Sequence, residues 1–91
     1  MPIEVTIPTI LRTYTGGRKA VQADGATLAE LVDDLEQRHP GLSERLVEGD
    51  NLRRFVNVYV NDEDVRFTGG LKTPVDDGDH VVVLPAVAGG A

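Results

Sequence analysis

The side chains that most often perform chemistry in proteins are sparse in this sequence. There is no cysteine, which excludes a thiolate nucleophile, a persulfide and a disulfide framework. His39 and His80 stand alone without metal-ligand spacing, so we interpret each as structural. The carboxylates of residues 33–36 (DDLE) and 76–79 (DDGD) fall in a predicted helix and a predicted turn, where we expect solvated side chains. The sequence therefore predicts neither a metal site nor a catalytic group of its own.

The segment after Pro85 is the other candidate for chemistry. It contains no side chain larger than valine, and its residues are Ala86, Val87, Ala88, Gly89, Gly90 and Ala91. Such residues are too small to pack into a core, and a segment of this kind is often only a frayed end. We predict a compact domain at residues 1–85 and a flexible tail at residues 86–91.

Size and charge limit the class of protein. The 91 residues are enough for one domain with a single small core. No apolar stretch approaches the ~20 residues of a membrane span, and the first residues do not resemble a signal peptide, so we expect a cytoplasmic protein with no membrane partner. The net charge of -6 argues against a nucleic-acid partner and suits docking onto a basic protein surface.

The first half of the sequence predicts a hairpin followed by a helix. Residues 3–8 (IEVTIP) alternate apolar and polar side chains, and residues 19–23 (KAVQA) follow a glycine turn. Pro8 cannot donate to a ladder, so pairing should stop or bulge there. Thr27 and Glu30 form a capping box, and an i, i+3, i+4, i+7 stripe follows it to about His39: Leu28, Leu31, Val32 and Leu35.

The second half predicts one short helical turn and then further strands. Residues 55–61 (FVNVYVN) alternate, with the valines on one face and Phe55 and Tyr59 on the other, where they contact a partner or pack under a loop. Residues 80–85 (HVVVLP) are nearly continuously apolar, which favours a central strand covered on both faces. This order predicts an α+β domain with one main helix across a mixed sheet, and it resembles the β-grasp, or ubiquitin-like, fold.

The C-terminal third resembles a known family. The pattern comprises Thr73-Pro74-Val75, Asp77-Gly78-Asp79, Val81, Pro85, Val87 and Gly89-Gly90. It is similar to the signature of the MoaD/ThiS family of ubiquitin-like sulfur carriers. Residues 55–67 and 84–90 resemble most closely the CysO-type carriers of a cysteine-biosynthetic route. Ala91 departs from the pattern, because family members work through a chain that ends at the second glycine.

The resemblance implies that the chain is a protein substrate and not an enzyme. An E1-like partner would use ATP to adenylate Gly90, and a sulfur source would then leave a C-terminal thiocarboxylate. Val87, Ala88 and Gly89 would thread through the channel of the partner, because small residues let the backbone pass. No cofactor would be bound permanently. A JAMM-type zinc metalloprotease would remove Ala91.

Two functions of different classes share this activation step. A sulfur carrier would give its sulfur to an activated serine, O-phosphoserine, on a pyridoxal-phosphate-dependent cysteine synthase, and the JAMM-type protease would release the cysteine. Molybdopterin, thiazole and siderophore pathways use the same kind of tail. A ubiquitin-like modifier would instead form an isopeptide bond between Gly90 and a lysine. A simple binding module with a vestigial tail is a third and weaker interpretation.

Overall fold

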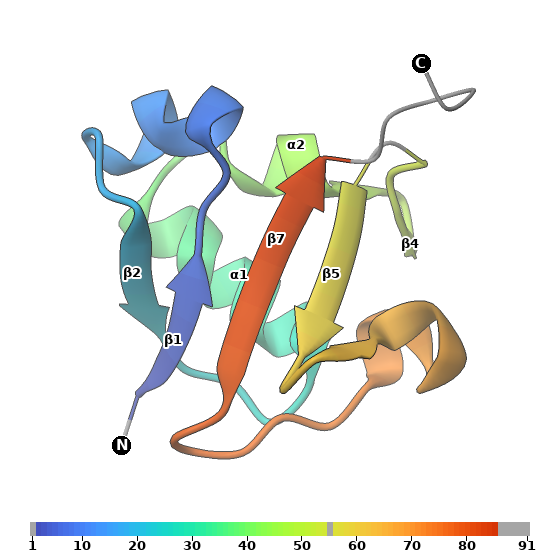
Figure 1. Cartoon of the computed structure of the whole chain (residues 1–91). Coiled ribbons are helices and arrows are strands. Elements are labelled where there is room, and N and C mark those ends of the chain that lie inside the picture. Colours follow the sequence, from blue (N-terminus) through green and yellow to red (C-terminus); the bar gives the residue numbers. More distant parts are fainter. Residues whose placement is uncertain (1, 55, 86–91) are drawn as a thin grey trace.

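The core of the protein is one mixed sheet with α1 packed across one of its faces (Figure 1). The computed structural model describes residues 2–54 and 56–85. The strand order is β2-β1-β7-β5-β6, and β1 and β7 run parallel while the other pairs are antiparallel. Their bounds are β1 Ile3–Thr6, β2 Ala20–Ala23, β5 Val56–Val60, β6 Glu63–Asp64 and β7 His80–Pro85. The predicted α+β class and mixed sheet are confirmed.

The predicted helix is α1 (Leu28–Arg38), and it ends one residue before the expected His39. The Thr27 hydroxyl accepts a hydrogen bond from the Glu30 backbone N–H at 3.3 Å. The Glu30 carboxylate accepts from the backbone N–H of Ala26 at 3.2 Å, one residue earlier than in a standard capping box. The amphipathic stripe is buried against the sheet as predicted: Leu28, Leu31, Val32 and Leu35.

The two strands with alternating side chains, β1 and β5, bury their apolar residues on the face that meets α1, as predicted. Ile3, Val5 and the three valines of β5 are buried, and Val81 and Val83 of β7 join them in one cluster. β7 lies at the centre of the sheet, between β1 and β5. The expectation that β7 is covered on both faces is wrong. Val82 is only half-buried and Leu84 is 44% exposed, because the helices lie on one face and leave the other open (Figure 1).

The connection between the first two strands contains the predicted glycine turn, at Gly16 and Gly17, and before it a 3-10 helix that the sequence did not predict. β1 ends at Thr6, although the Ile7 N–H still donates to the Lys19 carbonyl at 2.7 Å. After Pro8 the chain forms the 3-10 helix η1 (Thr9–Thr15), which buries Leu11 and ends at the left-handed Gly16. Proline ends the strand because it has no N–H for the ladder.

The remaining elements are short. The expected helical turn is α2 (Ser43–Leu46). It leads into a small antiparallel pair, β3 (Val47–Glu48) and β4 (Asn51–Leu52), that the sequence did not predict. The loop before β7 contains two 3-10 turns, η2 (Val65–Phe67) and η3 (Gly70–Lys72). None of the helices within residues 2–54 and 56–85 has the length and apolarity that a membrane crossing demands.

Candidate functional site

The end of β7 sets where the predicted tail leaves the domain. Pro85 is opposite Val56, the first residue of β5, at the end of the sheet where η1 and α2 also lie (Figure 1). The tail residues that the sequence singles out lie outside the described residues, and so does Phe55: Val87, Ala88, Gly89, Gly90 and Ala91. The described part of the site is therefore the surface around Pro85.

A groove of about 440 Å³ adjoins Pro85. Its walls come from η1, α2, β5, β7 and the segment before β5, and they include Pro8, Ile10, Leu11, Tyr14, Arg45, Arg53, Val56 and Leu84. Ile10 is 69% exposed and Leu84 is 44% exposed, so a partner that meets this end of the sheet finds apolar surface. The sequence reasoning missed this groove because its residues come from separate segments of the chain.

Two arginines give the groove a positive charge in an otherwise acidic protein. The Arg45 Nε donates to the Tyr14 hydroxyl at 2.7 Å, and the guanidinium carbon lies 5.7 Å from the centre of that ring. The Arg53 Nε donates to the carbonyl of Glu44, and Arg53 Nη1 lies 3.9 Å from the Glu48 carboxylate. The Arg45 contact holds α2 against η1, and the Arg53 contacts hold the segment before β5 against α2 and β3.

The carboxylate of Glu36 positions α2. It accepts hydrogen bonds from the backbone N–H groups of Gly41, at 3.0 and 3.1 Å, and of Ser43, at 3.0 Å. These bonds, first that of Gly41 and then that of Ser43, hold the pKa of Glu36 below its ordinary value because they favour the ionised form. Asp79 has a lowered pKa for the same reason, through the Asn61 amide and the backbone N–H of Asp76.

Replacement of Glu36 by glutamine should make the free energy of unfolding depend less on pH in the acid range. A carboxylate whose folded pKa is lowered stabilises the fold above its unfolded pKa, and this contribution is lost as pH falls through the folded value. The free energy of unfolding of the unmodified chain should therefore fall below about pH 4.5 more steeply than that of Glu36→Gln. Urea titrations across the acid range measure this. Glu44→Gln is the matched control on α2, and equal slopes for all three proteins would refute the role of Glu36.

Tyr59 lies on the open face of the sheet, where the sequence placed it. It is half-buried, pairs with Val82 across the ladder, and lines a hollow of about 270 Å³ with Asp62, Val82 and Leu84. Leu84 lines both this hollow and the groove beside Pro85. The open sheet face and the base of the tail therefore form neighbouring parts of one surface.

His80 has partners that its sequence context did not reveal. Its Nδ1 lies 3.0 Å from the Glu4 carboxylate, and its Nε2 lies 3.0 Å from the Thr6 hydroxyl. All three side chains project from the open sheet face. The arrangement ties β1 to β7.

The acidic stretches stabilise the fold, although the sequence predicted that their side chains would be solvated. Asp34 accepts from Arg38 at 2.9 Å, and Asp79 accepts from the backbone N–H of Asp76 at 2.8 Å within the glycine turn before β7. The turn contains Gly78 at φ 86°, a backbone conformation that glycine adopts without strain. Among the described residues, no three His, Asp or Glu side chains are grouped so that they could hold a metal ion.

A protein-family model matches almost the whole chain. The model is that of the ThiS family, and it matches residues 5–90. The chain belongs to the ThiS family. The match runs through Gly89-Gly90 and stops before Ala91.

Relatives of this ThiS family member are similar over most of the chain. The sulfur carrier protein CysO of Mycobacterium tuberculosis is 58% identical over 93 aligned positions, which cover 99% of this chain and 100% of that protein. Small archaeal modifier protein 3 of Haloferax volcanii is 42% identical over 67 aligned positions, which cover 74% of this chain and 73% of that protein.

A solved structure confirms the predicted β-grasp architecture. A chain in the Amycolatopsis orientalis BexX/CysO complex is 62% identical and superposes with a TM-score of 0.91, covering 96% of this chain and 98% of that chain. The predicted resemblance to CysO-type members of the ThiS family is confirmed by both the sequence and the structural likeness.

Proposed function

We propose that this chain is a sulfur carrier whose Gly90 carboxyl becomes a thiocarboxylate. The observation that carries the proposal is the 58% identity to the sulfur carrier protein CysO over almost the whole chain. The family match that includes both glycines of the tail supports Gly90 as the reacting residue. The protein acts as a co-substrate of other enzymes in the cytoplasm, where ATP is available.

The chemistry needs two displacements, because a carboxylate is a poor electrophile. A carboxylate oxygen of Gly90 attacks the α-phosphate of ATP, and diphosphate leaves. A sulfur nucleophile then attacks the carbonyl carbon of the adenylate, and AMP leaves with the oxygen that was bonded to phosphorus. An E1-like enzyme supplies both steps, and the small residues Val87, Ala88 and Gly89 carry Gly90 into its channel.

The surface around Pro85 suits this delivery. The groove with Ile10 and Leu84 provides apolar contact area, and Arg45 and Arg53 provide charge at the base of the tail. The open face with Tyr59 continues the same surface, so a partner that holds the domain here receives the tail directly. That a CysO-type relative forms a complex with BexX supports the use of such a surface by carriers of this kind.

We further propose cysteine synthesis as the route that receives the sulfur. The thiocarboxylate attacks O-phosphoserine on a pyridoxal-phosphate-dependent synthase, phosphate leaves, and an S-to-N acyl shift gives cysteine in amide linkage to Gly90. A JAMM-type zinc metalloprotease then hydrolyses that amide. The likeness to CysO-type carriers supports this acceptor over the molybdopterin, thiazole and siderophore routes.

A second function has its own supporting observation. The 42% identity to small archaeal modifier protein 3 favours a ubiquitin-like modifier, in which a lysine amine attacks the Gly90 adenylate. Both functions share activation and differ in the nucleophile. Mass spectrometry separates them, since cysteine attached to Gly90 supports the carrier and isopeptide adducts on lysines of other proteins support the modifier.

Valine at position 90 should abolish activation without unfolding the domain. A β-branched side chain obstructs a channel that admits glycine, whereas we expect residues as small as those after Pro85 to contribute little to the stability of the domain. With a chain ending at position 90, Gly90→Val should lose ATP–diphosphate exchange with the activating enzyme and keep its melting temperature. Ala26→Val, in the exposed loop before α1, is the control and should keep both. A normal exchange rate for Gly90→Val would contradict the proposal that the tail enters a narrow channel of the activating enzyme.

A further inference from the structure

The outer edge of β2 presents unpaired backbone groups. β2 is at the end of the sheet, and within residues 2–54 and 56–85 no strand pairs with its outer side (Figure 1). The Ile7 N–H donates to the Lys19 carbonyl, so the alternation of an antiparallel ladder assigns Val21 to the bonds with β1. The N–H and C=O groups of Ala20 and Gln22 therefore point outward.

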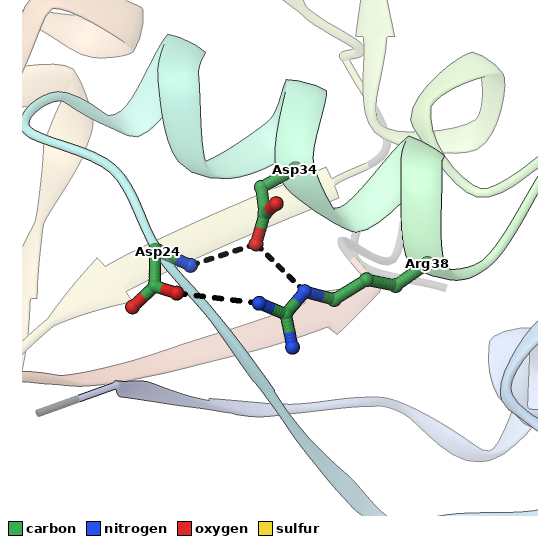
Figure 2. A network of polar contacts seen from close by, with 3 residues as sticks. All are labelled: Asp24, Asp34 and Arg38. Carbon is green, nitrogen blue, oxygen red and sulfur yellow. Dashed lines mark hydrogen bonds and ion pairs between the residues drawn. The ribbon is translucent and has the colours of Figure 1, made fainter.

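A groove runs beside this edge. It has a volume of about 450 Å³ and lies between β2 and the C-terminal end of α1, with Arg18, Arg38 and His39 among its lining residues. Figure 2 shows the contacts of Arg38, one of these lining residues: its Nε donates to Asp34 at 2.9 Å and its Nη2 donates to Asp24 at 3.2 Å. Asp34 also accepts from the Asp24 backbone N–H at 2.9 Å, so the edge is capped at the residue that follows β2.

The charge of this edge is opposite to that of the whole chain. The net charge is -6, yet Arg18 and Lys19 lie side by side immediately before β2, both exposed. Neither side chain has an ion-pair or hydrogen-bond partner among the described residues. The third nitrogen of the Arg38 guanidinium, Nη1, is likewise unused there, while the other two are held by the aspartates (Figure 2). An incoming strand with carboxylates would find two cations that are unpaired within the described residues, Arg18 and Lys19, at the start of β2, whereas Arg38 is already paired with Asp24 and Asp34.

We propose that the outer edge of β2 binds an extended, acidic segment of another protein. The segment adds to the sheet as a further strand, with its backbone bonded to Ala20 and Gln22 and its carboxylates toward Arg18 and Lys19. In this mode the backbone bonds supply affinity and the side chains supply selectivity. A second copy of this chain is the competing occupant, because its β2 edge carries both cations and the exposed Asp24 carboxylate, and the test below distinguishes it.

This docking site is separate from the sulfur chemistry. β1 lies between β2 and β7, so an occupant of the β2 edge leaves the groove at Pro85 open. A partner can therefore hold the carrier by β2 while a second protein receives the tail. The proposal does not depend on which nucleophile attacks Gly90.

A peptide titration followed by NMR tests the site. The probe is a short capped peptide in which valine alternates with aspartate, and its control has lysine in place of aspartate. The aspartate peptide should shift the amides of Ala20 and Gln22 and slow their exchange with solvent, with weaker binding at higher salt. The lysine peptide should leave them unchanged. Absence of shifts at millimolar peptide, or shifts confined to another face, would overturn the proposal.

Matched variants separate the edge from general charge. Lys19→Glu and Lys72→Glu change the net charge equally, but Lys19 directly precedes β2 whereas Lys72 is exposed in η3. Lys19→Glu should weaken binding about fivefold and Lys72→Glu less than about twofold. Ala20→Pro removes an outward N–H and should weaken binding about tenfold. Equal effects of the two lysine variants, or a dimer in light scattering that buries the edge without peptide, would refute the acidic segment.

Discussion

A chain that ends at Gly90 is expected to exchange one carboxyl oxygen for sulfur, whereas the chain that carries Ala91 is expected to stay unchanged. The carboxyl that the proposal requires is locked in a peptide bond to Ala91 in the longer form. Adenylation at residue 91 would move the reacting carbon by about 3.3 Å along the channel. A misplacement of about 1 Å already costs roughly a hundredfold in rate, so the longer chain should be inert.

Intact-protein mass spectrometry after incubation with the activating enzyme, ATP and a sulfur source measures this conversion. Ala91→Gly is the informative control, because it removes the methyl group and keeps the extra length. It should be as inert as the chain with Ala91. If the chain gains sulfur with Ala91 still attached, the hypothesis that Ala91 must first be removed is wrong. The JAMM-type protease is then not needed before activation.

Leu31→Ala should cost about 2–5 kcal/mol of unfolding free energy. Leu31 lies in the middle of α1, has no exposed surface, and packs in the cluster that joins this helix to the sheet. Its truncation leaves a cavity that the flanking leucines cannot fill. Urea denaturation followed by circular dichroism measures the loss.

Gln37→Ala, on the exposed side of the same helix, is the control for Leu31→Ala and should change stability by less than about 0.5 kcal/mol. At temperatures where the Leu31→Ala domain is folded, a Leu31→Ala chain ending at Gly90 should be adenylated normally. A loss below about 1 kcal/mol would contradict the placement of Leu31 in the core.

The elements that the sequence predicted well are those in which local pattern and tertiary burial agree. Thr27 and Glu30 mark the start of α1 by local hydrogen bonds, and the apolar run of β7 reflects its central position. The 3-10 helix η1 was missed because its buried residues, Leu11 and Thr15, are too few to give a period. The exposed second face of β7 was missed because Val82 and Leu84 are apolar without being fully covered.

The candidate site also has one part that the sequence indicates and one part that it does not. Tail residues stand next to one another in the sequence, so composition and the family pattern are enough to indicate Gly90. The groove at Pro85 depends on Tyr14 and Arg45, which are 31 residues apart, and His80 meets Thr6 across 74 residues. The contact of His80 with Thr6 depends on the strand order β2-β1-β7, which places β1 beside β7.

The parallel pairing of β1 with β7 also determines when the domain can fold during its synthesis. β1 is made first, yet its neighbour at the centre of the sheet is the last strand to be made. Closing a loop of this length costs entropy that only the completed core repays, since Val81 and Val83 belong to it. A nascent chain on the ribosome therefore cannot assemble the carrier step by step. The described domain can therefore fold only after β7 has emerged from the ribosome, and a chain that lacks β7 has no complete sheet.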